Sequence, residues 1–173
     1  VAQLQDLLIY TLKGISEIVV KGEVDVSSLG DTNYEVLSSL FMTITNANFD
    51  KSRFITRILM AYEMRNAAKE RLINAGGKTD GITFDGAHWV GETEAEMTEK
   101  AFGVGVLATE SEDIRSVREL TIYGLKGMAA YAEHAYTLGY IQDDIFAFME
   151  KALAATINDK LSADELVALV MEC

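Results

Sequence analysis

The sequence predicts an all-α fold in which two three-helix bundles, related by internal duplication, are joined by an irregular connector. Apolar side chains recur at helical spacing along most of the 173 residues. Proline is absent, which permits long uninterrupted helices. The phrase Leu4–Gly14 also returns as Val117–Gly127, 113 residues later at both ends, and each copy closes on Ile-Tyr-x-Leu-Lys-Gly. Such distant copies favour two related helical units over a solenoid of short repeats.

The first bundle is expected within residues 1–77 and opens with a helix over Ala2–Lys21. Its leucine, isoleucine and valine side chains fall on one stripe, and a glycine follows the helix directly. The second helix is expected to begin at Thr32, which makes a capping-box pair with Glu35, and to end near Asn46.

The third helix is expected to follow the N-cap Asp50 and to end near Ala75, where two glycines stop it. The connector then occupies residues 78–108. Two Asp-Gly turns flank a short apolar run in its first half, which permits a small hairpin. A short helix follows from Thr93, which is paired with Glu96 as a capping box.

The second bundle is expected within residues 109–173. Its long first helix begins near Thr109, has Glu112 in the capping-box position and ends at Leu138-Gly139. This helix carries the second copy of the repeated phrase. Its predicted inward stripe consists of Val117, Leu120, Thr121, Gly124, Leu125, Met128, Tyr131 and Ala132.

Two more helices complete the second bundle. One is expected over about 142–158, and the last begins at Ser162, which forms a capping box with Glu165. Each copy of the repeated phrase therefore opens a set of three helices, which suggests that a bundle was duplicated. Helix counting leaves a single up-and-down bundle open as the alternative.

The composition narrows the possible functions. Lys and Arg number 15 against 27 Asp and Glu, and a net charge of −12 argues against nucleic-acid binding. No apolar stretch approaches the roughly 18–20 residues that span a bilayer, and no signal-peptide layout is present. The lone cysteine, Cys173, excludes an internal disulfide and fits a reducing, cytoplasmic location. Because the sequence starts at Val1 without methionine, we expect it to be a piece of a longer protein.

Each copy of the repeated phrase ends on a lysine and a glycine, Lys13-Gly14 and Lys126-Gly127. A glycine within a helix costs about 1 kcal/mol relative to alanine, and close packing against another backbone can offset that cost. We therefore interpret both glycines as packing positions. Both lysines are interpreted as solvated charges near helix ends.

The other polar motifs indicate no catalytic, cofactor-binding or metal-binding residue. His88 and His134 are isolated, without partners at ligand spacing, and are interpreted as surface or hydrogen-bonded histidines. The polar turn Asn46–Asp50 is explained by helix capping. No nucleophile elbow or phosphate-binding loop occurs. One acidic cluster lacks the Glu-x-x-His pattern of di-iron bundles; it consists of Glu92, Glu94, Glu96 and Glu99.

Three phrases in order carry a family resemblance. Leu4–Gly14, Thr43–Asp50 and Leu120–Gly127 with Tyr131–Ala135 together resemble the N-terminal helical domain of the hybrid cluster protein. This family is also called prismane protein or hydroxylamine reductase. The resemblance covers essentially the whole chain, and it agrees with the helical, duplicated fold that the residues predict.

The resemblance implies that the full-length protein holds two iron–sulfur clusters and reduces hydroxylamine or nitric oxide. A cubane cluster would be held by four cysteines upstream of Val1, and a hybrid iron–sulfur–oxygen cluster by two α/β domains downstream of Cys173. Cys173 resembles a cysteine that belongs to neither ligand set. The implied partners are the missing cysteine segment, the α/β domains and a redox protein. A free-standing helical interaction module is the alternative reading.

Overall fold

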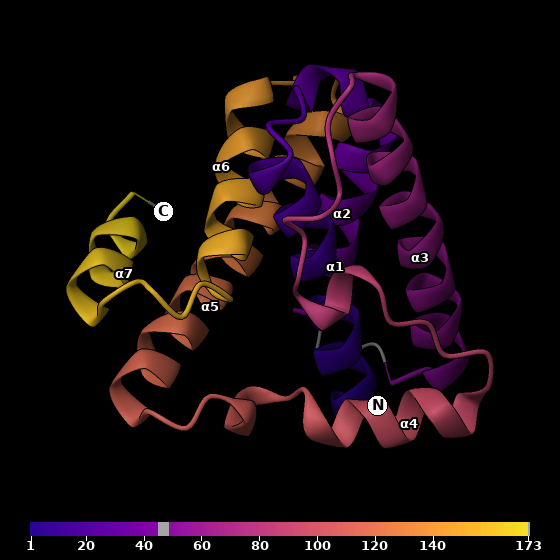
Figure 1. Cartoon of the computed structure of the whole chain (residues 1–173), viewed down its shortest axis with the longest axis vertical. Helices are drawn as coiled ribbons and strands as arrows, with labels where there is room; N and C mark the ends of the chain where they lie inside the picture. The colour runs from indigo at the N-terminus through magenta and orange to yellow at the C-terminus, as the bar shows by residue number, and fades with distance from the viewer. Residues whose placement is uncertain (45–48, 173) are drawn as a thin grey trace.

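The computed structural model describes residues 1–44 and 49–172, and every regular element in this part of the chain is helical (Figure 1). The predicted all-α class is therefore confirmed. Three short 3₁₀ helices lie between the main helices: η1 (Val26–Leu29), η2 (Asp85–Ala87) and η3 (Val106–Ala108). The α-helices of the described residues are α1 (Ala2–Lys21), α2 (Asp31–Met42), α3 (Lys51–Asn74), α4 (Glu94–Gly103), α5 (Glu112–Thr137), α6 (Asp143–Ala155) and α7 (Ala163–Val170).

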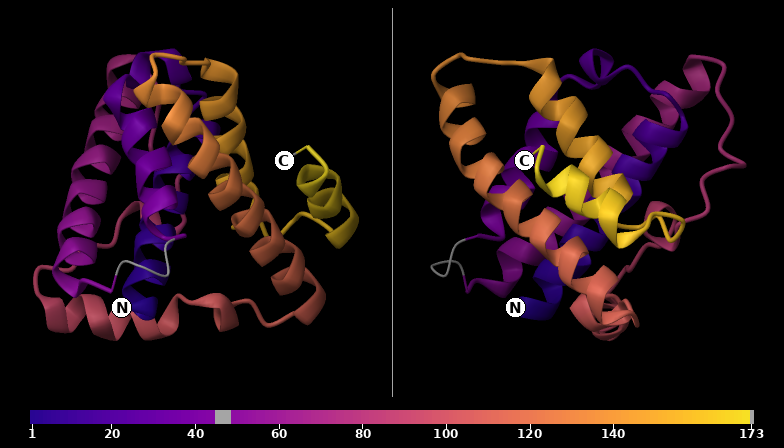
Figure 2. Two further views of the ribbon diagram at one scale, coloured as in Figure 1. Left: turned by 180° about the vertical axis from the view of Figure 1, so that it is seen from behind. Right: turned by 90° about the vertical axis from the view of Figure 1, so that its left-hand side faces the viewer.

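Helix α1 lies at the centre of the molecule. It packs against α3, α6, α4 and η2, while α2 packs against α5 (Figure 2). Burial of apolar side chains on these helices supplies the main driving force for the fold. Because α1 meets α6 and α2 meets α5, the helices assigned to residues 1–77 and 109–173 share one core. The division into two bundles and their origin by duplication both stay predictions.

Several helix ends lie where local sequence signals placed them. α1 spans the predicted residues, and the Asp50 side chain accepts a hydrogen bond from the Ser52 amide at the start of α3. Both capping boxes predicted in the second half for short helices form. Thr93 pairs with Glu96 before α4, and Ser162 pairs with Glu165 before α7. Such caps satisfy backbone amides that lack a partner within the helix.

Two predicted capping boxes were wrong. α2 begins at Asp31 rather than Thr32, because Gly30 precedes it with φ +53°, a backbone conformation that glycine adopts easily. Glu35 is drawn away from the helix start and forms an ion pair with Arg57 of α3. α5 is capped by Ser111, not Thr109, and its first residue is Glu112. α2 also ends at Met42, before the predicted Asn46, which lies outside the described residues.

The inward face of α5 was also predicted wrongly in part. Leu120 and Tyr131 point outward and are 52% and 84% exposed. Thr121 and Leu125 are buried as predicted. The full buried set on this helix is Arg118, Thr121, Ile122, Leu125 and Ala129. The buried face thus includes Ile122 and Ala129, which the prediction omitted, and leaves out Leu120 and Tyr131.

The connector contains no hairpin in the structure, since residues 78–91 form turns and η2 rather than strands. Two buried charged side chains fasten it to the helices. Glu17 of α1 accepts hydrogen bonds from the amides of Thr83 and Phe84, at 3.3 and 2.9 Å. Arg65 of α3, which is 1% exposed, donates to the carbonyls of Gly86 and Trp89, both at 2.8 Å. Hydrogen bonds to a charged group are stronger than neutral ones, so the connector is firmly placed.

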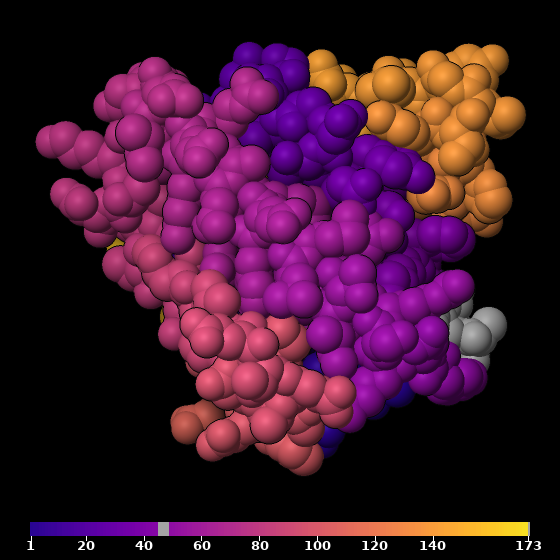
Figure 3. Space-filling model, turned by 90° about the vertical axis from the view of Figure 1, so that its right-hand side faces the viewer, coloured from indigo at the N-terminus to yellow at the C-terminus, as the bar shows by residue number. Residues whose placement is uncertain are grey.

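Helices α3 and α4 form much of one outer face of the molecule (Figure 3). α3 covers the middle of this face and α4 lies below it (Figure 3). Helix α4 crosses beneath the N-terminal end of α1, and the chain then runs through η3 to the start of α5 (Figure 1). This route carries α5 away from α1 at its lower end and leaves room for the cavity described next.

Candidate functional site

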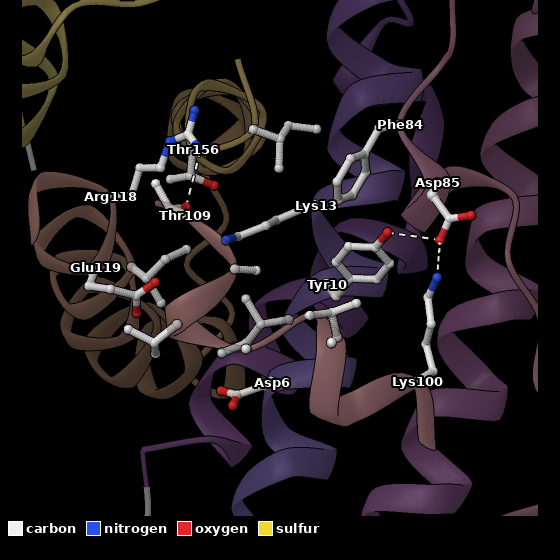
Figure 4. Close-up of a pocket in the computed structure, with 18 of the residues that line it drawn as sticks. Asp6, Tyr10, Lys13, Phe84, Asp85, Lys100, Thr109, Arg118, Glu119 and Thr156 are labelled. Carbon is white, nitrogen blue, oxygen red and sulfur yellow. Dashed lines mark hydrogen bonds and ion pairs between the residues drawn. The ribbon is translucent and has the colours of Figure 1, made fainter. Parts of the chain in front are cut away.

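A cavity of about 410 Å³ lies between α1 and α5, the two helices that carry the repeated phrase (Figure 4). The segment from the end of α4 through η3 closes one side of it, and residues that follow α6 close another. The polar side chains of its wall come from five separate stretches of sequence. They are Asp6, Tyr10 and Lys13, then Asp85, Lys100 and Thr109, then Arg118 and Glu119, and finally Thr156 and Asp159.

The repeat places an acid and a lysine at matching positions of the two helices, and three of these four residues line the cavity. Asp6 and Lys13 of α1 correspond to Glu119 and Lys126 of α5 at the same 113-residue offset. Seven residues are about two helical turns, so the acid and the lysine of each copy lie on one face of their helix. In Figure 4, Asp6 and Lys13 extend from α1 toward α5, and Glu119 lies on the α5 side of the cavity.

These four side chains influence one another electrostatically. Burial raises the pKa of Asp6, and the like charge of Glu119 raises it further, while Lys126 and Lys13 oppose the shift. Burial lowers the pKa of Lys13, against the attraction of Glu119. Lys126 is affected in the same way, with Asp6 and Glu119 opposing the effect of burial. Each lysine therefore sits in the field of both acids, although none of the four makes a close ion pair within the described part of the chain.

The opposite wall is held by Tyr10, Asp85 and Lys100. The Tyr10 hydroxyl donates a hydrogen bond to the Asp85 carboxylate at 2.8 Å, and the Lys100 ammonium lies 2.6 Å from the same oxygen. Burial and the bond to Asp85 raise the pKa of Tyr10. Burial acts to raise the pKa of Asp85, but the hydrogen bonds from Lys100 and Tyr10 outweigh it and hold that pKa below its usual range. The cluster joins α1, the connector and α4.

Arg118 of α5 is a buried cationic residue that lines the cavity. Its guanidinium donates to Asp159 at 2.8 Å and to the Thr109 hydroxyl at 3.3 Å. The residue is 8% exposed, and its Nε has no hydrogen-bond partner among the described residues. Arg118 thereby ties the start of α5 to the segment that follows α6.

The structure places the glycines and lysines singled out in the sequence at different kinds of position. A Cβ placed on Gly14 would lie 2.2 Å from the Gly86 carbonyl oxygen, so the predicted close approach is confirmed there, with the connector as the partner. At Gly127 no atom lies within 4 Å of such a Cβ, so the packing interpretation was wrong for that residue. The interpretation of Lys13 and Lys126 as solvated charges was also wrong, because both side chains are half-buried and burial lowers the pKa of both.

The other residues considered in the sequence lie apart from the cavity or outside the described chain. The His88 Nε2 lies 2.8 Å from the Ile82 carbonyl oxygen within the connector, and the His134 ring meets Phe41 of α2. Glu94 pairs with Lys51, and Glu96 caps α4. Residues 46–48 of the polar turn and the lone cysteine at 173 fall outside the described residues. Within residues 1–44 and 49–172, no three His, Cys, Asp or Glu side chains gather as a metal site would require.

Sequence reasoning missed the cavity itself, but a usable signal was present. The acids Asp6 and Glu119 stand seven residues before Lys13 and Lys126 in the two copies, and charges repeated at equivalent positions indicate a shared surface. Asp85, Lys100 and Asp159 could not be found in this way. They come from turns and short elements whose approach to α1 depends on the tertiary fold.

The fold and the site together define a helical domain that carries a charged cavity between two similar helices. Within the described residues, no helix is both long and apolar enough to cross a membrane. The whole chain, residues 1–173, matches the family model described as the Prismane/CO dehydrogenase family. The chain belongs to this family.

About half of the residues of this chain are identical to those of several curated hydroxylamine reductases. The chain is 51% identical to a hydroxylamine reductase of Desulfitobacterium hafniense (strain DSM 10664 / DCB-2) over 99% of its length, 50% identical to one of Acetivibrio thermocellus over 99%, and 49% identical to one of Clostridium novyi (strain NT) over 100%. It covers 31% of each of these relatives. The chain therefore spans about a third of the length of the proteins it matches.

Proposed function

We propose that this chain is the helical domain of a hydroxylamine reductase, and that residues 1–173 have a structural role in it. The observation that carries the proposal is the identity of about half of all residues to hydroxylamine reductases along the entire chain. We propose that the intact protein acts on hydroxylamine, or on nitric oxide, and this proposal is supported by the family and not by any side chain described above.

We infer that the redox centre of the reaction lies outside this chain. Cleaving an N–O bond reductively takes electrons, and side chains such as Lys13 or Glu119 can bind and orient but cannot store them. A cubane iron–sulfur cluster needs about four thiolate ligands. Cys173 is the only cysteine in the sequence, so the donor set does not fit such a cluster. We propose that the cubane and the hybrid cluster of the parent protein are held by its other segments.

The partners of this domain are then parts of the same polypeptide. We propose that they are an N-terminal cysteine-bearing segment and C-terminal α/β domains, with a separate redox protein as electron donor and a reducing, cytoplasmic location. The firm anchoring of the connector by Glu17 and Arg65 supports a framing role, because a scaffold must hold its own irregular segments still.

A free-standing helical interaction module is the competing reading. It is disfavoured because the match runs over the full chain and involves relatives about three times as long. Exposed aromatic side chains on α5 suit a module that binds another protein, but they equally suit a domain that packs against the remainder of its own chain.

The test compares the segment with its parent under identical anaerobic conditions. Hydroxylamine consumption is measured with a reduced viologen dye, on purified residues 1–173 and on the protein encoded by the full reading frame. We expect turnover by the cluster-loaded parent and none by the segment. Turnover by metal-free segment would refute the structural role, and an inactive parent that holds its clusters would refute the assignment to hydroxylamine reduction.

A further inference from the structure

The two copies of the repeated phrase differ in what covers them. The offset of 113 residues makes Leu7, Tyr10, Gly14 and Ile18 of α1 equivalent to Leu120, Tyr123, Gly127 and Tyr131 of α5. The spacing of three and then four residues keeps each set on one face of its helix. The same sequence surface can therefore be compared in two environments within a single molecule.

On α1 this face is covered. Leu7 and Ile18 are fully buried. The connector lies against the middle of the face, where the Gly86 carbonyl approaches Gly14 so closely that a methyl group there would collide with it. A carboxylate of the same connector accepts the hydrogen bond of the Tyr10 hydroxyl. The face of α1 thus receives an irregular backbone segment that needs a glycine beneath it.

On α5 the equivalent face is bare. Tyr123 and Tyr131 are 76% and 84% exposed, and Leu120 is 52% exposed. The space above Gly127 is open. Seen from behind, α5 runs diagonally across the near side of the molecule (Figure 2, left). Two tyrosines and a leucine around a glycine are a costly surface to leave in water, and tyrosine is enriched where proteins make contacts.

We propose that this face of α5, formed by Leu120, Tyr123, Gly127 and Tyr131, is the docking site for a segment of the parent polypeptide outside residues 1–173. The occupant approaches Gly127 with its backbone, as the connector approaches Gly14, and accepts a hydrogen bond from the Tyr123 hydroxyl. The part of each relative that this chain does not match is about twice as long as residues 1–173. A parent of similar length would therefore contain a segment that could cover this face.

One difference between the copies refines the proposal. Glu17, which holds connector amides on α1, corresponds to Ala130 on α5. The occupant of α5 therefore lacks an acidic anchor at that position and is held chiefly by apolar contact and by Tyr123. Such contact suits a segment that is already tied to the domain covalently, because the chain connection lowers the entropy cost of docking.

The first experiment is hydroxyl-radical footprinting of the intact, cluster-loaded parent, read by mass spectrometry against the same protein unfolded in urea. Tyr62, which is 5% exposed, serves as the buried reference. We expect the reactivity of Tyr123 and Tyr131 to fall to the level of Tyr62. Reactivity equal to that in urea would overturn the proposal. Protection that disappears on dilution would also overturn it, because a second copy would then be the occupant.

The second experiment adds bulk at the glycine. Gly127→Leu in the intact parent should lower Tm by at least ~2 °C, because the side chain collides with the docked segment. The matched control is Ala67→Leu, which adds a similar side chain at an exposed position of α3 and should leave Tm unchanged. Equal Tm values for the two variants would count against docking at Gly127.

The proposal rests on the family assignment but not on the reaction. A parent that reduces hydroxylamine while its two tyrosines remain reactive would refute the docking site alone. A parent with protected tyrosines and no turnover would refute the proposed activity alone.

Discussion

Glu150 of α6 is a carboxylic acid enclosed against α1, and no cation of the described residues lies beside it. Its side chain is fully buried, and the Ser16 hydroxyl donates a hydrogen bond to one of its oxygens at 2.5 Å. The other oxygen has no partner among the described residues. Burial raises the pKa of Glu150 to about 7, and the bond from Ser16 only partly opposes this. The folded protein therefore keeps this group largely protonated below neutral pH.

This shift predicts a pH-dependent stability. The unfolded chain releases the Glu150 proton near pH 4.5, but the folded chain holds it until about pH 7. The free energy of unfolding should thus fall as pH rises between these values, by about 3 kcal/mol in all. Glu150→Gln cannot ionise, so the stability of the variant relative to wild type should increase by that amount between pH 4 and pH 8 in urea unfolding of residues 1–173.

A comparison with the exposed acid Glu63 makes the experiment specific. Glu63→Gln lies on the outer face of α3 and should keep a constant difference from wild type over the same pH range. A difference for Glu150→Gln that is equally flat would mean that the buried carboxyl ionises with its ordinary pKa in the folded state.

At the scale of single elements, the sequence predicts what is decided locally. The helix ends at Thr93 and Ser162 follow from side chains that bond to amides three residues away, and both were found. The start of α2 was missed because Gly30 adopts a positive φ and Glu35 pairs with an arginine on another helix. Local sequence cannot weigh such a distant partner against a cap.

The face of α5 shows a second limit of sequence reasoning. Periodicity identifies the most apolar stripe of a helix, but it does not tell which part of the chain covers that stripe. Leu120 and Tyr131 fit the predicted stripe, and both are exposed. The cavity between α1 and α5 was missed for a related reason, since its walls join turns that only the tertiary fold brings together.

The two repeated glycines predict opposite effects of the same substitution. Gly14→Ala should destabilise residues 1–173 by about 1–3 kcal/mol, because its methyl group would meet the Gly86 backbone, which cannot rotate away. Gly127→Ala should stabilise the same segment by roughly 0.5–1 kcal/mol, since the space is open and alanine favours the helix. Urea unfolding of both variants measures the two signs. Destabilisation by Gly127→Ala would show that its surface is already covered within the segment.

At the scale of the whole molecule, the two helices that carry the repeated phrase share one environment and differ in another. Asp6 and Lys13 of α1 and Glu119 of α5 line one cavity, whereas the other faces of the two helices differ, covered on α1 and bare on α5. A central helix buried on all sides needs neighbours from the whole chain, and α1 has them in α3, α4 and α6. Helix α5 would be covered in the same way only if further chain packed on it, and the relatives, which are about three times as long as residues 1–173, contain such chain.

The proposed structural role predicts that iron binds to the parent protein and not to residues 1–173 alone. A cubane cluster takes about four thiolates, and residues 1–173 contain one cysteine, so anaerobic reconstitution of the segment with iron and sulfide should give a colourless monomer. The parent, treated identically, should take up iron and absorb in the visible range. Absorbance must be normalised to monomer after gel filtration, because several chains can share one cluster through single cysteines. A stoichiometric visible band from the monomeric segment would mean that other side chains of this domain complete a ligand set, and its purely structural role would then be abandoned.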